Sequence, residues 1–488
     1  MSVAEQDQPK LDDRAREPKL RRTMGPSDLV LFYITAIVGL RWVASAARVG
    51  PSAISIWVIA LISFFVPLAA AVIELSSRYP EEGGIYLWSK RAFGEFHGFM
   101  SGWTYWTSNI VYYPGLLFYA ASNSAYIIPK YAHLAESNSF VVVVSICGLA
   151  IALVLNLVGL NIGKWLHNAS GSLGTWLPAM ILVTTALIAW MRFGSATHFS
   201  LAGLIPRPQS IDDLVLWSTL AFGFSGFEAA SFMGGEIRNA RRNIPRAVLT
   251  AGCIITFIYV AGTASVLVAL PPTTATGLTG ITDAVASTAE RVGGQASGSF
   301  LASAVSLLQV IGYVGGVGAW LAASARIPFV AGIDRHLPRA FGKIHPRWGT
   351  PYVALLVQGM LTLIFISLAK IAGQTAEQAY EVLVSLAKIA TFIPYLYLFA
   401  SLIKLQSEPP PNGVLRVPGR RLGAYIVAIV GLSVTAFSIL LSCWPDKDVT
   451  DKAFFFKTVF GTMIADIGIG MFIYFAGSRR RDADSIAT

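Results

Sequence analysis

Long apolar stretches separated by short polar segments recur along the whole chain. The stretch from Val49 to Ile73 alone runs 25 residues without a charged side chain. A helix needs roughly 20 apolar residues to cross the hydrocarbon of a bilayer. The pattern therefore predicts an all-α integral membrane protein with about 12 transmembrane helices, centred near residues 37, 63, 108, 150, 180, 223, 258, 312, 360, 390, 431 and 466.

Two of these predicted spans are interrupted at their centres by glycine followed by a charged residue. Gly39-Leu40-Arg41 lies in the first span and Gly226-Phe227-Glu228 in the sixth, each about a dozen residues into its span. Matching interruptions five spans apart are typical of transporters built from two inverted five-helix repeats, with broken helices at the binding site. The alternative is a glycine kink that only lets neighbouring helices approach closely.

The interruptions and the span pattern predict the organisation of the whole chain. We expect a 5+5 inverted repeat with broken helices 1 and 6, followed by two extra C-terminal helices. The segments between the spans, of which the longest are about 271–297 and 326–350, are too short for an independent core. The expected units are a tail at 1–23, a first repeat at 24–192, a second repeat at 212–403, helices 11 and 12 at 421–477, and a tail at 478–488.

Composition and charge agree with a membrane protein and define its orientation. The chain of 488 residues is 54% hydrophobic and 13% charged, with a formal net charge of +10. Of its 37 lysines and arginines, 26 fall in the two tails and the alternate loops on the same side. Basic residues gather on the cytoplasmic side of spanning helices, so we expect a multi-pass protein of the cytoplasmic membrane with both termini inside. The same explanation leaves little basic charge for nucleic-acid binding.

Sequence motifs for catalysis and for ATP use are missing from the chain. The six histidines lie near span ends or in loops, without His-x-x-x-His spacing. No glycine-rich phosphate loop ends in Lys-Ser or Lys-Thr, and the three cysteines are far apart. We therefore expect no enzyme, no metal and no cofactor.

Ionisable residues deep in predicted spans are functional candidates because their burial in lipid is costly. They are Arg41, Glu228, Lys388 and Asp466, with Glu74 toward the inner end of the second span. The excess of positive charge favours an acidic or zwitterionic substrate over a polyamine. Arg41 also has the alternative of extending its guanidinium to the outer surface.

A broken helix offers both ends of an amino acid a partner. The N–H groups at the start of the outer half of helix 1 favour a carboxylate, and carbonyls released at both breaks favour an ammonium. Aromatic residues on spans 3 and 6 are expected to cover the substrate, although for any single one of them ordinary packing is the better explanation. The predicted substrate-binding residues are Ile37, Val38, Gly39, Leu40, Arg41, Trp42, Tyr112, Tyr113, Phe222, Gly223, Phe224, Ser225, Gly226, Phe227 and Lys388.

Three runs of sequence resemble the amino acid, polyamine and organocation transporter superfamily. They are ELSSRYPEEGGIYLWSKRAFG at 74–94, SGFEAASFMGGEIRNARRNIPRA at 225–247 and ARIPFVAGIDRHLPRAFGKIHPRWGTP at 325–351. The resemblance covers most of the chain in the superfamily's order. It implies that Glu228 acts in proton-sensitive gating, and Glu74 is a second candidate for proton coupling.

The chain departs from the superfamily's usual pattern in the first helix. Val38-Gly39-Leu40-Arg41-Trp42 replaces Gly-Ser-Gly-Ile, which resembles more loosely the bacterial glutamate/GABA antiporter branch. Thr175 stands where some relatives carry a lysine, so the coupling ion is not implied. We expect a secondary transporter of amino acids that works by alternating access, driven by protons or by exchange. The alternatives are polyamine or other organic cation transport, and a nutrient receptor or channel of the same fold.

Overall fold

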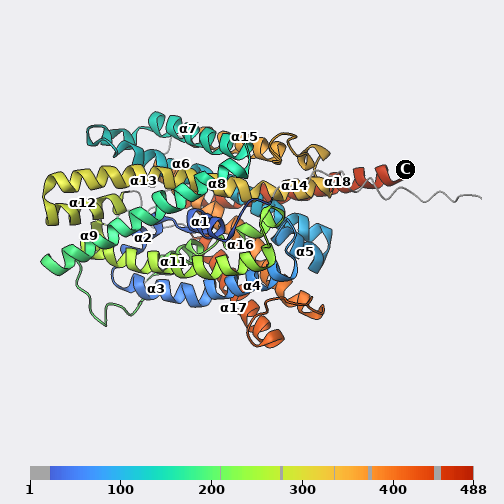
Figure 1. Cartoon of the computed structure of the whole chain (residues 1–488), viewed down its shortest axis with the longest axis horizontal. Coiled ribbons are helices and arrows are strands. Elements are labelled where there is room, and N and C mark those ends of the chain that lie inside the picture. Colours follow the sequence, from blue (N-terminus) through green and yellow to red (C-terminus); the bar gives the residue numbers. More distant parts are fainter. Residues whose placement is uncertain are drawn as a thin grey trace, which may run out of the picture.

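The computed structural model describes residues 22–208, 210–274, 279–334, 336–371, 376–444 and 452–486, and helices dominate this part of the chain. Among the described residues, eight helices are long and apolar enough to cross a membrane, or nine if one bent pair counts as a span. The 12 predicted centres each lie in, or at the end of, a different helical segment. The prediction of an all-α membrane protein is confirmed. Figure 1 shows the helices lying side by side along the long axis of the molecule.

The helices follow the predicted order of spans. The first five spans are α1 (Pro26–Ile37) with α2 (Leu40–Ala47), α3 (Ser52–Ala60) with α4 (Val66–Arg78), α6 (Glu95–Ala125), α7 (Asn138–Leu157), and α8 (Leu160–Ala169) with α9 (Leu177–Phe193). The next five are α10 (Ile211–Gly223) with the 3-10 helix η5 (Ala229–Glu236), α11 (Ala240–Ala269), α13 (Gln295–Ser324), α15 (Tyr352–Ile371) and α16 (Ala376–Lys404). The last two are α17 (Arg420–Ser442) and α18 (Lys452–Ile486).

The segments between spans contain helices that the hydropathy pattern did not predict. They are α5 (Ile85–Phe93), α12 (Gly280–Gly293) and α14 (Arg326–Ile333). In α12 one face is buried, including Ile281 and Val285, while Glu290 is exposed. Such a helix is too short and too polar to span a membrane, so its average hydropathy resembles that of a loop. At the C-terminus α18 continues past residue 477, and most of the predicted N-terminal tail lies outside the described residues.

The break in the first span is present where the glycine pattern predicts it. Val38 and Gly39 have extended backbone between α1 and α2, and the two helix axes differ by 43°. A Cβ atom on Gly39 would lie 2.7 Å from the indole of Trp42. No other residue fits there without moving that ring, so the glycine permits the close packing of the break.

The sixth span is broken in the same way. Helix α10 ends at Gly223, and η5 begins only at Ala229. Between them Gly226 has φ of +111°, and a Cβ atom there would lie 2.8 Å from the indole of Trp320 on α13. Both the backbone conformation and the close approach require glycine. The backbone groups that leave the regular helix at the break are buried inside the helix bundle, as a membrane requires.

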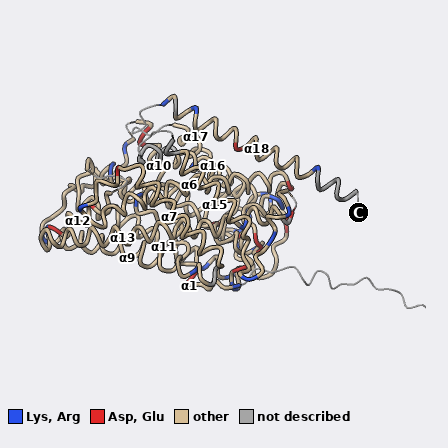
Figure 2. The backbone as a smooth tube through the Cα atoms, turned by 90° about the horizontal axis from the view of Figure 1, so that it is seen from above, with Lys and Arg blue, Asp and Glu red and all other residues tan. Residues whose placement is uncertain are grey.

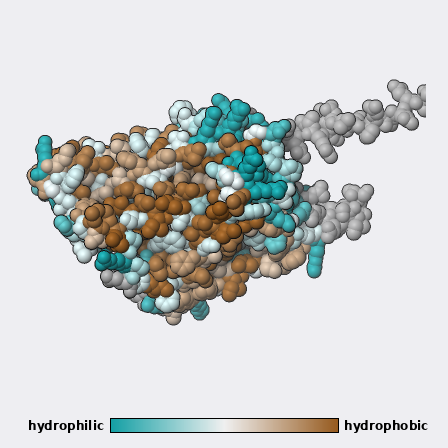
Figure 3. Space-filling model, turned by 90° about the horizontal axis from the view of Figure 1, so that it is seen from below, coloured by the Kyte–Doolittle hydropathy of each residue, from teal (hydrophilic) through white to brown (hydrophobic). Residues whose placement is uncertain are grey.

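The surface has the distribution expected of a protein that crosses a bilayer. In Figure 2 the Lys, Arg, Asp and Glu residues gather toward the two ends of the long axis, and the middle holds few of them. Figure 3 shows apolar side chains across the middle of one face. On α17 and α18, Leu440, Ile464 and Phe472 each expose more than 70% of their surface. Such exposed apolar residues are stable in contact with lipid.

Candidate substrate site at the two helix breaks

The ends of the broken helices are joined by one tyrosine of α11. The hydroxyl of Tyr259 lies 2.9 Å from the carbonyl oxygen of Ile37 and 2.7 Å from that of Gly223, the last residues of α1 and α10. The hydroxyl proton is shared between these two acceptors. The sequence predicted that carbonyls released at the breaks favour a substrate ammonium, and Tyr259 already occupies one acceptor position on two of them. Each oxygen keeps a second lone pair.

The start of α2 is held by a second tyrosine, on α13. The backbone N–H of Arg41 donates to the hydroxyl of Tyr313 over 3.3 Å, and that of Trp42 donates to the carbonyl of Gly39 over 2.9 Å. The N-terminus of α2 therefore points its N–H groups toward the interior of the bundle. Its positive dipole end favours an anion at this place.

Arg41 lies inside the bundle rather than at its surface. Its residue surface is 1% exposed, and its guanidinium carbon lies 4.2 Å from the ring centre of Trp42 and 5.3 Å from that of Tyr112. The guanidinium also donates to the Tyr112 hydroxyl. The alternative in which Arg41 extends to the outer surface is therefore wrong. Stacking on two aromatic faces fixes the guanidinium plane, which leaves its edge for hydrogen bonding.

Two small cavities adjoin the break in the first span, and each has room for about one water molecule. They share Ala36, Ile37 and Tyr112 in their walls. The first is lined by Thr35, Ala36, Ile37, Val38, Gly39, Leu40, Tyr112, Leu116, Gly174, Thr175, Gly312, Tyr313 and Gly316. The second is lined by Ala36, Ile37, Trp42, Tyr105, Ser108, Asn109, Tyr112, Phe222, Ser225, Trp320 and Thr391. An amino acid fits only when side chains of these walls move.

Several predicted residues pack behind these cavities instead of lining them. Phe224 and Phe227 contact Phe65 on the side of α3 and α4, with ring centres 5.5 and 4.6 Å away. The Tyr113 hydroxyl bonds to Ser324, and Gly226 contacts Trp320. These residues support the walls of the cavities.

Lys388 lies on α16, with 5% of its surface exposed, and does not line either cavity. Its ammonium donates to the hydroxyl of Thr219 on α10 over 3.1 Å. Through this bond it holds α10 against α16. The tenth span therefore contacts the broken sixth span at this point.

Glu228 is completely buried between the sixth span and two neighbouring helices. Its Oε1 accepts hydrogen bonds from the hydroxyls of Tyr105 on α6 (2.5 Å) and Tyr395 on α16 (2.9 Å). Tyr395 in turn accepts the N–H of Gly226 over 2.9 Å. Within the described part of the chain, Oε2 has no hydrogen-bond partner. Because Tyr105 lines the second cavity, Glu228 is separated from that cavity by one side chain.

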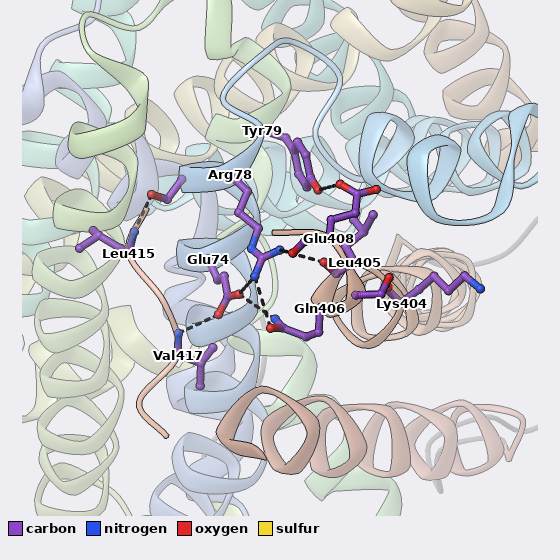
Figure 4. Close-up of polar contacts among 11 residues, drawn as sticks. Glu74, Arg78, Tyr79, Lys404, Leu405, Gln406, Glu408, Leu415 and Val417 are labelled. Atoms are coloured by element: carbon purple, nitrogen blue, oxygen red, sulfur yellow. Dashed lines mark hydrogen bonds and ion pairs between the residues drawn. The ribbon is translucent and has the colours of Figure 1, made fainter. Parts of the chain in front are cut away.

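Glu74, the second candidate for proton coupling, lines neither cavity. Figure 4 shows it pointing toward Arg78, Gln406 and Val417. It pairs with Arg78 over 2.8 Å and accepts 2.7 Å hydrogen bonds from the Gln406 side chain and the Val417 N–H. Arg78 donates to the carbonyl of Leu405 over 2.8 Å. Glu74 and Arg78 therefore fasten the segment between α16 and α17 onto α4.

Sequence reasoning missed the residues that connect the breaks to the surrounding helices. They are Tyr105, Tyr259, Tyr313, Tyr395 and Trp320. The signal for them is weak because a tyrosine in an apolar span is as common in packing as in hydrogen bonding. No cluster of metal-binding side chains occurs among the described residues, and the three cysteines there are unpaired.

Comparison with known proteins identifies relatives along nearly the whole chain. Residues 24–465 match the model of the family described as amino acid permease. An uncharacterized transporter of Legionella pneumophila is 25% identical over 95% of this chain and 98% of its own length. A probable agmatine/putrescine antiporter of Lactococcus lactis is 22% identical over 84% of this chain and 87% of its own. A glutamate/serine transporter of Bacillus subtilis is 25% identical over 88% of this chain and 78% of its own.

Proposed function

This chain belongs to the amino acid permease family and is a multi-pass membrane transporter of small molecules, and we propose that its substrates are amino acids, carried by alternating access. The observation that carries the proposal is the meeting of two helix breaks at Tyr259, beside cavities lined by the break residues. There, opposite helix ends offer N–H groups and carbonyl groups within one short space. Only a substrate with a carboxylate and an ammonium uses both.

The substrate carboxylate binds at the N-terminus of α2, where Arg41 adds a fixed cation. The ammonium binds at the second lone pairs of the carbonyls of Ile37 and Gly223, next to the Tyr259 hydroxyl. Trp42 and Phe222, whose ring centres are 6.0 Å apart, cover the substrate from the outer side. These aromatic rings must separate for entry because the closed cavities hold little more than water.

Alternating access follows from the different attachments of the two halves of each broken span. The inner halves, α1 and η5, move as a pair against the other helices, and the outer halves, α2 and α10, move in the opposite phase. The membrane is the cytoplasmic one, with both termini inside, as the distribution of basic residues predicts. Residues 24–192 and 212–403 form the two repeats.

Proton coupling or exchange supplies the driving force, and Glu228 is the coupling residue. Its carboxyl is enclosed by protein, and Tyr105 and Tyr395 link it to α6 and α16. Loss of the proton leaves a buried charge that draws both hydroxyls closer. Gain of the proton weakens these bonds and releases the inner half of the sixth span.

Counterflow in proteoliposomes tests this function. Vesicles loaded with unlabelled glutamate, serine, γ-aminobutyrate, putrescine or agmatine are assayed for uptake of the same labelled compound. A carrier of amino acids shows uptake accelerated by internal amino acid, and a channel shows no acceleration. Arg41→Gln should lose uptake of acidic more than of neutral amino acids. Arg48→Gln, at the other end of α2, serves as the matched control.

The results separate the alternatives. Acceleration by putrescine or agmatine alone would identify an organic cation carrier and reject amino acids. Binding of amino acids in a thermal-shift screen without flux in vesicles would indicate a receptor that retains the fold.

A further inference from the structure

The turn after the second span presses on the inner half of the sixth. We call residues 80–84, Pro-Glu-Glu-Gly-Gly, the inner turn. A Cβ atom on Gly234 of η5 would lie 2.2 Å from the carbonyl oxygen of Pro80, and one on Gly235 would lie 2.7 Å from Oε1 of Glu82. Gly234 accepts no larger side chain because it faces backbone, and a larger residue at Gly235 would have to displace the Glu82 side chain. The inner turn therefore covers η5 directly and closes the inner side of the broken span.

A buried ion pair lies beneath the inner turn. Arg326 of α14 donates to both carboxylate oxygens of Glu236, over 2.7 and 2.8 Å, and both side chains are 3% exposed or less. The two charges neutralise each other in a geometry that suits a guanidinium and a carboxylate. The pair connects the end of η5 to the end of the eighth span.

Glu82 adds a second carboxyl to this place without adding a second cation. Its Oε1 is buried and has no hydrogen-bond partner within the described residues. Burial first, and then the charge of Glu236, raise the pKa of Glu82 to about 8, although Arg326 acts in the opposite direction. A carboxyl in this position is stable in its protonated form, because ionisation would leave a second negative charge beside Glu236.

Among the described residues, two ion pairs lie beside the inner turn and involve neither Glu82 nor Glu236. Glu81 is exposed and lies 3.9 Å from Arg91 of α5. Lys90 of α5 pairs with Asp334 over 2.7 Å. The charges that act on Glu82 are those of Glu236 and Arg326.

We infer that Glu82 is a proton-binding site of the inner gate, which holds a proton while the inner turn covers η5 and releases it to water when the two separate. The inference rests on the proposed alternating access, and it adds a place of proton release on the inner side, distinct from Glu228. Separation of the inner turn from η5 hydrates the carboxyl and moves it away from Glu236. The proton then passes to water, and the carboxylate remains.

The direction of the pH effect follows from the two states of Glu82. Its pKa is about 8 in the closed gate and near the ordinary 4.5 once the side chain is hydrated. Below the lower value both states hold the proton, so closure is favoured most. As pH rises through the window between these values the closed gate loses this stabilisation. From pH 6 to pH 8 the ratio of closed to open gates falls on the order of 50-fold.

Labelling of a buried cysteine measures the opening of this gate. Ser231 of η5 is 3% exposed and lies directly under the inner turn, since a Cβ atom on Gly84 would be 2.4 Å from its hydroxyl. Ser231→Cys is made in a chain whose three natural cysteines are replaced by alanine. The rate of reaction with a water-soluble thiol reagent is measured from pH 6 to pH 8, in the Glu82 parent and in Glu82→Gln.

The Glu82 parent and Glu82→Gln carry the same thiol at position 231, and its ionisation changes both labelling rates equally with pH. The ratio of the two rates therefore reports only the opening of the gate. We expect the rate of the parent, divided by that of Glu82→Gln, to rise on the order of 50-fold from pH 6 to pH 8. Glu81→Gln, an exposed neighbour, should behave as the parent does. A ratio that stays constant with pH would overturn the inference.

A second variant covers the case in which Glu82→Gln does not fold. Glu82→Asp keeps a carboxyl group on a shorter side chain. We therefore expect the pH at the midpoint of the labelling-rate profile to move. An unchanged midpoint would also overturn the inference. Labelling needs no substrate. A negative labelling result for Glu82 therefore does not bear on the counterflow test of amino acid transport. A negative counterflow result likewise does not bear on the pH dependence of labelling.

Discussion

Removal of one hydroxyl at the centre of the molecule tests whether Tyr259 holds the two breaks together. In Tyr259→Phe the ring keeps its place, because it stacks on Trp57 with ring centres 4.3 Å apart and planes 18° from parallel. The carbonyls of Ile37 and Gly223 lose their shared donor. The perturbation therefore concerns hydrogen bonding and leaves packing nearly unchanged.

The magnitude follows from the burial of these carbonyls. A buried polar group left without its partner costs about 1–3 kcal/mol, which corresponds to a factor of roughly 5–150 between two conformations. The lower half of this range applies if water enters the small cavities and replaces the hydroxyl. We expect Tyr259→Phe to lower the melting temperature and to shift the balance between inward-open and outward-open states.

The assay is thermal unfolding of the purified protein in detergent, together with initial rates of counterflow. Tyr131→Phe is the control, because the Tyr131 side chain is 45% exposed. The control should match the parent in both measurements. If Tyr259→Phe also matches it in melting temperature and in uptake, the hydroxyl does not join the helix ends and the site must be interpreted without it.

Three further substitutions test other parts of the site. Glu228→Gln keeps the shape and hydrogen bonding of the side chain but cannot lose a proton, so substrate binding should persist while most of the pH dependence of uptake is lost. If uptake depends on pH as in the parent, Glu228 is not the proton-coupling residue. Lys388→Ala should reach the membrane but transport more slowly, because the bond of Lys388 to Thr219 positions α10; unchanged kinetics would show that Lys388 serves only in packing. Gly226→Ala should lower the yield of folded protein, at a cost of about 1–3 kcal/mol for its positive φ before any clash with Trp320, and normal yield in size-exclusion chromatography would contradict this.

The sequence alone determined that this chain folds in a lipid bilayer, in which order its spans follow, and where both helix breaks lie. The length of an apolar stretch is a local property of the sequence. A helix in lipid makes its backbone hydrogen bonds internally and needs only enough apolar residues to cross the hydrocarbon. Gly39 and Gly226 are informative for the same reason. A glycine with a charged residue two positions later destabilises a spanning helix, so such a pattern in a span indicates a break. Apolar length does not identify short amphipathic helices such as α12, because only one of their faces is apolar.

The tertiary structure decided which side chains meet, and these contacts cross large distances along the chain. Tyr259 reaches a carbonyl 222 residues away, and Arg78 reaches one 327 residues away. Glu74, Glu82 and Glu228 are similar in sequence, as acidic residues in or beside apolar segments, yet one fastens a connecting segment, one lies beside an ion pair and one bonds two tyrosines. The partners of a carboxyl and its access to water determine its chemistry, and both arise only when distant helices pack together.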